Sequence, residues 1–205
     1  TREEGYGLNE IAVLKFHEDG TGLIITVDNG VSAVKEAELI YELGMKLVIT
    51  DHHQLPELLP KAEAIVNPHR RDDTSPYKEL AGCGVALKLI MALERDTDGV
   101  LEQYADLAAI GTIGDVVPLT GENRVIVKRG LMEMQYSENQ GLLSLIHEAG
   151  LDEENITSTG VAFGICPRIN AAGRYESPRA AAELFMAQTP QIARLKAQEL
   201  CELNN

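Results

Sequence analysis

The sequence predicts an α/β fold, in which a mostly parallel sheet flanked by helices forms a three-layer domain that is followed by a helical part. The first observation is a short apolar and β-branched run at residues 23–27, which is typical of a buried strand. The second is helical spacing of apolar residues over 31–43, followed by another apolar run at 45–49. The third is a mostly helical pattern beyond residue 81. Strand, helix and strand with short links form a βαβ unit, whose two strands are parallel.

The limits of these first elements follow from turn residues. Gly22 precedes the first strand, and the turn-like residues 28–30 follow it. Gly44 stands where a helix usually ends, because glycine adopts the left-handed conformation at little cost. The second strand ends at residues 50–53, and residues 64–66 predict a short third strand.

The second half of the chain has apolar residues three and four positions apart. The helices that we expect there cover residues 84–93, 101–110, 124–135, 141–149, 178–186 and 191–203. Pro190 indicates a break between the last two, because a proline disfavours helix in the residue before it. Residues 111–115 contain two glycines and end in Asp115, and we expect a loop at this point.

Composition excludes several classes of protein. The chain has 205 residues, 44% of them hydrophobic, which is enough for a sizeable core. No apolar run approaches the roughly 20 residues that cross a bilayer, and the first residues do not resemble a signal peptide. Cys83, Cys166 and Cys201 are far apart and odd in number, which favours a reducing compartment and hence the cytoplasm.

The net charge of −14 argues against a protein that holds nucleic acid mainly through its phosphates. Bound cations can nevertheless supply local positive charge, and a basic region can lie on another domain of a longer protein. The charge therefore makes nucleic acid less favoured as a partner without excluding it.

Polar side chains follow both strands of the βαβ unit. Asp28 follows the first strand, and Asp51, His52 and His53 follow the second. Ligands of parallel α/β sheets bind outside the carboxyl ends of the strands, so we expect these side chains to converge. Carboxylates and imidazoles are ligands for Mn²⁺ or Zn²⁺, whereas Mg²⁺ prefers oxygen. Asp115 is a further candidate ligand.

Each of these residues also has an ordinary structural interpretation. Asp28 can cap the following helix, and Asp51 can cap a loop. A single histidine is more often a hydrogen-bonded polar residue than a ligand, and Asp115 alone is typical of a loop. Two adjacent histidines directly after an aspartate at a strand end favour the metal site.

The motifs resemble those of a known family. Residues 26–30, 50–53, 67–68, 81–86 and 111–119 occur in the order seen in the DHH phosphoesterase superfamily. Residues 4–8 and 167–174 resemble its RecJ branch of single-stranded-DNA-specific exonucleases. The resemblance extends from residue 4 to about residue 204.

The resemblance implies a phosphodiesterase site with two divalent cations, Mn²⁺ or Mg²⁺. Asp28 matches the aspartate that bridges the two metals, and His52 and Asp115 match further metal ligands. His53 matches the histidine near the scissile phosphate, with Asp51 in a supporting catalytic role.

Arg174 matches a residue of the family's Gly-Arg pair. The resemblance implies that it contacts a substrate phosphate, as does His53. A surface salt bridge is the alternative role for Arg174.

The family's first motif, a strand that ends in closely spaced aspartates, is absent before residue 4. We therefore expect residues 1–189 to be a DHH catalytic domain without its N-terminal strand and first aspartate motif. Residues 190–205 would begin the interdomain connector helix. The exposed sheet edge would invite self-association. With an incomplete ligand set, this internal fragment should bind at most one metal weakly and be inactive or weakly active.

The function implied by the resemblance is 5′-to-3′ exonuclease action on single-stranded DNA in repair and recombination, with replication or repair proteins as possible partners. One alternative is a small-molecule or short-oligonucleotide phosphoesterase, such as a pyrophosphatase or cyclic-dinucleotide phosphodiesterase, which the acidic charge favours. Another is a non-catalytic replication scaffold. Such relatives tend to lose their metal residues, whereas Asp28, His52, His53 and Asp115 are present here.

Overall fold

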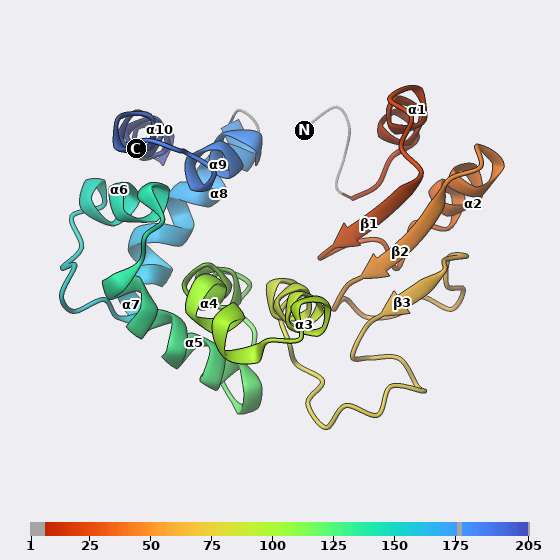
Figure 1. Cartoon of the computed structure of the whole chain (residues 1–205), viewed down its shortest axis with the longest axis horizontal. Coiled ribbons are helices and arrows are strands. Elements are labelled where there is room, and N and C mark those ends of the chain that lie inside the picture. The colour runs from red at the N-terminus through yellow and green to blue at the C-terminus, as the bar shows by residue number, and fades with distance from the viewer. Residues whose placement is uncertain (1–6, 176–177, 205) are drawn as a thin grey trace.

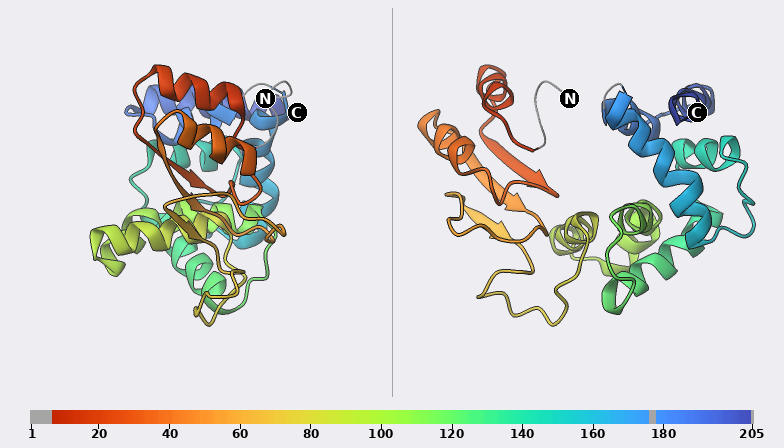
Figure 2. Two further views of the ribbon diagram at one scale, coloured as in Figure 1. Left: turned by 90° about the vertical axis from the view of Figure 1, so that its right-hand side faces the viewer. Right: turned by 180° about the vertical axis from the view of Figure 1, so that it is seen from behind.

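The structure is a computed structural model that describes residues 7–175 and 178–204. A small sheet with two helices on one side forms one end of the molecule, and a helical part forms the other (Figure 1). Helix α3 lies between the two ends, as the view from behind also shows (Figure 2, right). The sheet and the helical part therefore meet around α3.

The sheet contains β1 (Leu23–Val27), β2 (Lys46–Thr50) and β3 (Ala64–Val66), in that order. Both pairs are parallel, and the last residue of β1 lies opposite the last residue of β2. The predicted βαβ unit and third strand are confirmed, with β2 starting one residue later than expected. Because β1 and β2 end in register, the residues that follow them start side by side at the carboxyl ends of the strands.

The helices of the first half are α1 (Glu10–Glu18), α2 (Val34–Glu42), α3 (Gly82–Glu94) and α4 (Thr97–Gly114). Those of the second half are α5 (Gly121–Glu133), α6 (Gln140–Glu148), α7 (Ser158–Gly160), α8 (Cys166–Tyr175), α9 (Pro178–Phe185) and α10 (Pro190–Asn204). A 3-10 turn, η1 (Met134–Tyr136), follows α5, and a π-helical turn, η2 (Val161–Ile165), joins α7 to α8. Within the described ranges, no helix combines the length and apolar character that crossing a bilayer requires.

One face of the sheet packs against α1 and α2. Ile24 of β1 and Leu47 and Ile49 of β2 are buried there with Val13 of α1 and Ile40 of α2. The alternate side chains of β1 point the other way and are about half exposed. This alternation is the period of two that a strand with one buried face requires.

The helical part has its own core. Fully buried side chains in this core include Leu142 and Leu145 of α6, Ile165 of η2, Leu184 of α9 and Leu200 of α10. Helix α10 packs against α6, α8 and α9, and Ala197 and Leu200 of α10 are buried in this core. The break at Pro190 is confirmed, because α9 ends at Phe185 and α10 starts at the proline.

The expectation of a loop at residues 111–115 is wrong. Helix α4 continues to Gly114, and Asp115 is its C-terminal cap. A Cβ atom on Gly111 would lie 2.7 Å from Cys83 Sγ of α3, and one on Gly114 would lie 3.2 Å from Cys166 Sγ of α8. The glycines allow close helix packing here, and this use of glycine outweighs its low helix propensity.

Two helical segments were not predicted from the sequence. Helix α1 is capped by Asn9, whose side chain accepts a hydrogen bond from the backbone N–H of Ala12 at 2.9 Å. Residues 158–175 are helical throughout α7, η2 and α8. Both segments depend on packing against other helices more than on a regular apolar pattern.

Candidate metal centre

Asp28 is the first residue after β1, and its backbone has a left-handed conformation with φ of 62°. Its N–H donates to the carbonyl of Thr50 at 3.0 Å, so the residue is still held by the neighbouring strand. Aspartate tolerates this conformation better than most residues because its short polar side chain can bond locally. The turn directs the carboxylate beyond the end of β2.

Helix α3 begins directly against this carboxylate. A Cβ atom on Gly82, the first residue of α3, would lie 2.1 Å from Asp28 Oδ1. Only a glycine lets the helix start so close to the aspartate. The amino end of α3 also favours negative charge nearby, because its partial charge is positive.

Asp51 is buried and supports the loop that carries the two histidines. Its carboxylate accepts hydrogen bonds from the backbone N–H groups of His52 at 2.8 Å and Val31 at 3.1 Å. It also contacts Nδ1 of His53 at 2.7 Å. Burial acts to raise the pKa of Asp51, but the hydrogen bonds from His53, Val31 and His52 outweigh it and the pKa is lowered. Asp51 is therefore an anion whose oxygens face the loop.

His52 lies between two carboxylates. Its Nε2 atom is 3.1 Å from Oδ1 of Asp28 and 3.4 Å from Oδ2 of Asp115. The close contact with the carboxylate of Asp28 is the main cause that raises the pKa of His52, and the charge of Asp115 adds to it against the effect of burial. Three predicted ligands, from the ends of β1, β2 and α4, thus meet at one point.

Asp115 reaches this point from the last turn of α4. Its N–H donates to the carbonyl of Gly111 at 2.9 Å, which continues the helix to the ligand. Burial is the main cause that raises the pKa of Asp115, the charge of Asp28 adds to it, and His52 opposes it. Val116 follows with φ of 60°, a strained conformation for a β-branched residue, and turns the chain away from the site.

His53 lies beside His52 on the outer side of the cluster. Their ring centroids are 4.6 Å apart, and the side chain of His53 is 47% exposed. One possible ligand atom each from Asp28, His52 and His53 lies within 4.8 Å of the others. His53 is thus placed either to bind a cation or to meet a substrate beside it.

The donor atoms suit a divalent cation. An octahedral ion with oxygen ligands at about 2.1 Å holds adjacent donors about 3.0 Å apart. The contacts of His52 with Asp28 and Asp115, at 3.1 and 3.4 Å, have this spacing. Carboxylate oxygens with imidazole nitrogens suit Mn²⁺, and the oxygens suit Mg²⁺. Four donor side chains cannot complete the coordination of two such ions.

A hollow of about 230 Å³ adjoins the carboxylates of Asp28 and Asp115. Residues that the sequence did not assign to the site also line it, namely Ile110, Gly111, Gly114, Cys166, Ile169 and Asn170. Asn170 belongs to the segment 167–174 that carries the RecJ resemblance. This resemblance was the sequence feature that could have indicated Asn170 as a residue of the site. The side chain of Arg174 lies outside the described residues, as do residues 4–6 of the RecJ-like segment 4–8.

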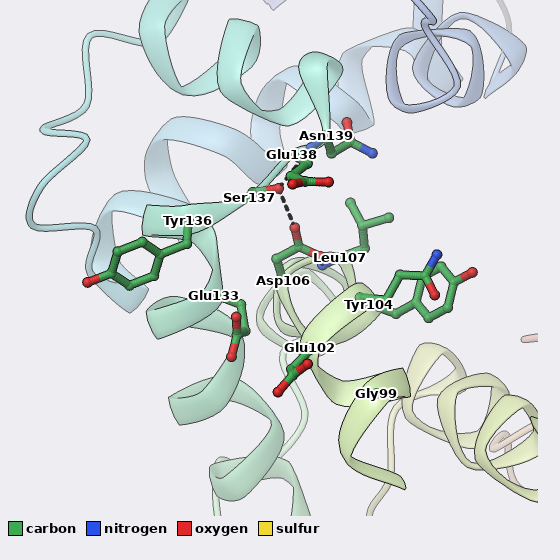
Figure 3. Close-up of a pocket in the computed structure, with 11 residues that line it drawn as sticks. Gly99, Glu102, Tyr104, Asp106, Leu107, Glu133, Tyr136, Ser137, Glu138 and Asn139 are labelled. Atoms are coloured by element: carbon green, nitrogen blue, oxygen red, sulfur yellow. Dashed lines mark hydrogen bonds between the residues drawn. The ribbon is translucent and has the colours of Figure 1, made fainter. Parts of the chain in front are cut away.

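A separate hollow of about 610 Å³ lies between α4 and α5, away from these ligands (Figure 3). Glu102, Glu133 and Glu138 line it, and Asp106 accepts a hydrogen bond from Ser137 at 2.7 Å. The first two glutamates are paired with Arg129. A hollow with these carboxylates repels phosphate groups, so it does not compete with the DHH residues as a phosphodiester site.

Comparison with known proteins bears on this arrangement. The model of the DHH family, N-terminal domain, matches residues 4–112. These residues include Asp28, Asp51, His52, His53 and the start of α3. The chain belongs to the DHH family.

The curated proteins whose sequences are similar to that of the DHH chain include exonucleases. The single-stranded-DNA-specific exonuclease RecJ of Bacillus subtilis is 44% identical over 202 residues, which cover 98% of this chain and 25% of that protein. The RecJ of Escherichia coli is 37% identical over 215 residues, which cover 98% of this chain and 37% of that protein. The DHH chain therefore spans a quarter to about two fifths of the length of these relatives.

Solved structures of exonucleases share the fold of the DHH chain. The structure of exonuclease RecJ bound to manganese matches with a TM-score of 0.87 at 38% identity, covering 98% of this chain and 51% of that one. RecJ from Thermus thermophilus in complex with Mn²⁺ matches with a TM-score of 0.84 at 37% identity, covering 95% of this chain and 29% of that one. The predicted α/β fold with a helical part is confirmed by these structures.

Proposed function

We propose that this chain is the catalytic core of a RecJ-type exonuclease that degrades single-stranded DNA from the 5′ end by metal-dependent hydrolysis. The observation that carries the proposal is the convergence of Asp28, His52 and Asp115 on one point, with His53 beside it. Family membership and the names of the relatives supply the substrate and the reaction. DNA repair and recombination are the processes that this activity serves.

Asp28, His52 and Asp115 would hold the divalent cation, Mn²⁺ or Mg²⁺, and Asp28 would bridge to a second one. Such cations, when bound, polarise phosphate oxygens and lower the pKa of bound water. The chain's own task is to hold Nε2 of His52 at 3.1 Å from the carboxylate of Asp28 and at 3.4 Å from that of Asp115. The first aspartate motif would supply the ligands that complete the second metal.

His53 and Asp51 would act on the substrate beside the metal. The carboxylate of Asp51 holds Nδ1 of His53, which fixes the ring orientation and directs Nε2 away from Asp51. Nε2 of His53 would then face the scissile phosphate, where it could donate a hydrogen bond to a phosphate oxygen or accept a proton. Arg174 would contact a second phosphate oxygen.

We further propose that residues 1–189 form the DHH catalytic domain and that α10 begins the connector to a further domain. The longer protein would act in the cytoplasm, which the three free thiols support. Single-stranded DNA is its proposed partner, together with replication or repair proteins.

We also propose that the isolated chain self-associates through β1. In the described part of the chain β1 pairs only with β2, so its other edge can accept another strand. Leu23, Ile25 and Val27 on its outward face are 47%, 50% and 52% exposed. An apolar edge strand of this kind is a site of strand pairing between copies.

The alternative is a phosphoesterase for pyrophosphate or a cyclic dinucleotide. The net charge of −14 favours it, because a small substrate needs no extended basic surface. Segments 4–8 and 167–174, which resemble the RecJ branch, argue against it.

The test is single-turnover hydrolysis with the chain in excess and Mn²⁺ present, using end-labelled single-stranded DNA, pyrophosphate and cyclic dinucleotide in parallel. We expect slow release of mononucleotides from the 5′ end of the DNA, lost in Asp28→Asn. Faster hydrolysis of either small substrate would favour the alternative. Because the isolated chain has an incomplete ligand set, the scaffold is tested on the longer protein, where no hydrolysis of any substrate would favour it. A rapid, processive rate would contradict the incomplete ligand set.

A further inference from the structure

A hollow of about 580 Å³ lies next to the histidine loop and is not part of the metal centre. One wall is the segment 54–59, which directly follows His53, and the other is the segment 69–72, which follows β3. Its volume is in the range of pockets that bind small organic molecules. Gln54, the residue after His53 in the chain, lines this hollow.

Asn67 holds the two walls together. The side chain is buried, its Nδ2 donates to the carbonyl of His53 at 3.0 Å, and its Oδ1 accepts from the N–H of His69 at 2.8 Å. The side chains of Gln54 and His69 are 3.5 Å apart across the hollow. The position of the hollow relative to His53 is therefore fixed by hydrogen bonds on both sides.

The two arginines of the second wall differ in their contacts. Arg70 is bidentate to Asp72 at 2.8 and 2.6 Å and donates to the carbonyl of Ile65 at 2.9 Å, so its charge is neutralised and its position is fixed. Arg71 is exposed, and within the described ranges it makes no ion pair. In a chain of net charge −14, an uncompensated guanidinium at this place attracts an anion.

The other wall combines apolar side chains with Gln54 and Glu57. Leu55, Pro56 and Leu59 are partly buried and face the hollow. Glu57 also borders it, so an anionic group must bind on the side of Arg71. A nucleotide has the matching parts, since its phosphate suits Arg71 and His69 and its sugar or base suits the apolar wall.

We propose that this hollow binds one nucleotide of the substrate strand, adjacent to the nucleotide whose phosphate lies at the metal centre. Arg71 and His69 bind its phosphate, and Leu55, Pro56 and Leu59 contact its sugar or base. The contacts do not read the edge of a base, so binding is tolerant of sequence. This inference rests on the proposed function, because it assigns the hollow to the same DNA strand.

The test is binding without hydrolysis, measured on the whole chain in EDTA. Fluorescence anisotropy with a labelled single-stranded oligothymidylate gives the dissociation constant and its salt dependence, for wild type, Arg71→Gln and Arg194→Gln. Arg194, on α10, is the control for the loss of one positive charge away from the hollow, since it lies at the far end of the molecule from β3 and is paired with Glu148 at 3.3 Å (Figure 1). We expect Arg71→Gln to weaken binding about tenfold at low salt and to reduce the slope of log K against log salt by about 0.7.

A second measurement locates the nucleotide directly. In amide NMR spectra, the dinucleotide pTpT should shift residues 54–59 and 69–72 of the wild type, and of Arg194→Gln, at concentrations that leave Arg71→Gln unshifted. The inference would be overturned if wild type and Arg71→Gln had equal affinity for DNA and equal slopes of log K against log salt. It would also be overturned if the wild type bound neither the oligothymidylate nor pTpT. Hydrolysis of DNA together with unchanged binding by Arg71→Gln would overturn the inference alone. Shifts at the hollow, together with faster hydrolysis of pyrophosphate or cyclic dinucleotide than of DNA, would overturn the exonuclease proposal alone.

Discussion

At the scale of single residues, the site depends on backbone positions that few other residues could occupy. Asp28 has φ of 62°, and the first residue of α3, Gly82, lies against its carboxylate. The strained Val116 follows Asp115. Unusual backbone conformations of this kind concentrate at functional sites because the surrounding structure must hold them.

Gly82→Ala should impair metal binding more than folding. The added Cβ would lie 2.1 Å from Asp28 Oδ1, so the carboxylate or the start of α3 must move. We expect Mn²⁺ affinity, measured by isothermal titration calorimetry, to fall by about tenfold or more. Gly22→Ala is the control, because nothing lies within 4 Å of its added Cβ. Equal affinity in both variants would contradict the role of Gly82.

Asp73 should contribute stability at neutral pH that is lost in acid. Hydrogen bonds from Lys78 and Ser75 lower the pKa of Asp73 to about 2, against about 3.9 in an unfolded chain. Because the folded pKa is the lower one, the stabilisation is complete above pH 4 and is lost as the pH falls towards 2.

Asp73→Asn should therefore lower the free energy of unfolding by about 1 kcal/mol at pH 7. Its difference from wild type should shrink between pH 4 and pH 2, as measured by urea denaturation. Lys78→Gln should show the same pH dependence. A difference that is constant over this range would show that Asp73 acts through packing.

At the scale of elements, the ligand Asp115 is placed by the packing of α4. This helix contacts α3, α5 and α8, and glycines lie at its closest approaches to α3 and α8. The approach of α5 is also through a glycine, since a Cβ on Gly130 would lie 2.1 Å from the carbonyl oxygen of Ala105. Tight contacts on three sides hold the end of α4 where Asp115 meets His52.

Gly130→Ala should destabilise the chain despite the higher helix propensity of alanine. The added methyl group would also lie 2.4 Å from Cβ of Ala109, so α4 and α5 must separate. We expect the free energy of unfolding to fall by about 2 kcal/mol, which chemical denaturation would measure. An increase in stability would mean that the helices shift apart without cost.

At the scale of the whole molecule, the sheet and the helical part meet at α3, with β1 at the outer edge of the sheet (Figure 1). The outward face of β1 is apolar, whereas the chain as a whole is strongly acidic. Charge repulsion between copies opposes association, and strand pairing with apolar contact at β1 favours it.

Ile25→Lys should shift the isolated chain towards monomer. Ile25 is 50% exposed on β1, and a lysine there places a charge on the pairing edge. Ile192→Lys on α10 is the matched control, because Ile192 is 49% exposed and far from β1. Sedimentation velocity over a range of concentrations should show association in wild type and in the control only. A wild type that stays monomeric would contradict self-association through β1.

The sequence by itself determined the βαβ unit and the position of the predicted ligands after its strands. Periodicity and turn residues act over a few positions, so Leu23–Val27 and the turn at Gly30 could be read locally. The positions of Asp28 and His52 at one sheet edge followed from the parallel pairing, and the structure places their side chains 3.1 Å apart.

Only the tertiary structure showed that the glycines of α4 allow close packing with neighbouring helices. The same holds for the contacts of Asp51 and for the hollow beside His53. A glycine in sequence indicates a turn, and only a neighbouring helix 2.7 Å from its missing Cβ makes Gly111 a packing residue. Asp51 became a support of the loop because its oxygens lie within reach of Val31 and His53. Contacts between residues far apart in the chain have no local pattern, and for this physical reason sequence periodicity could not predict them.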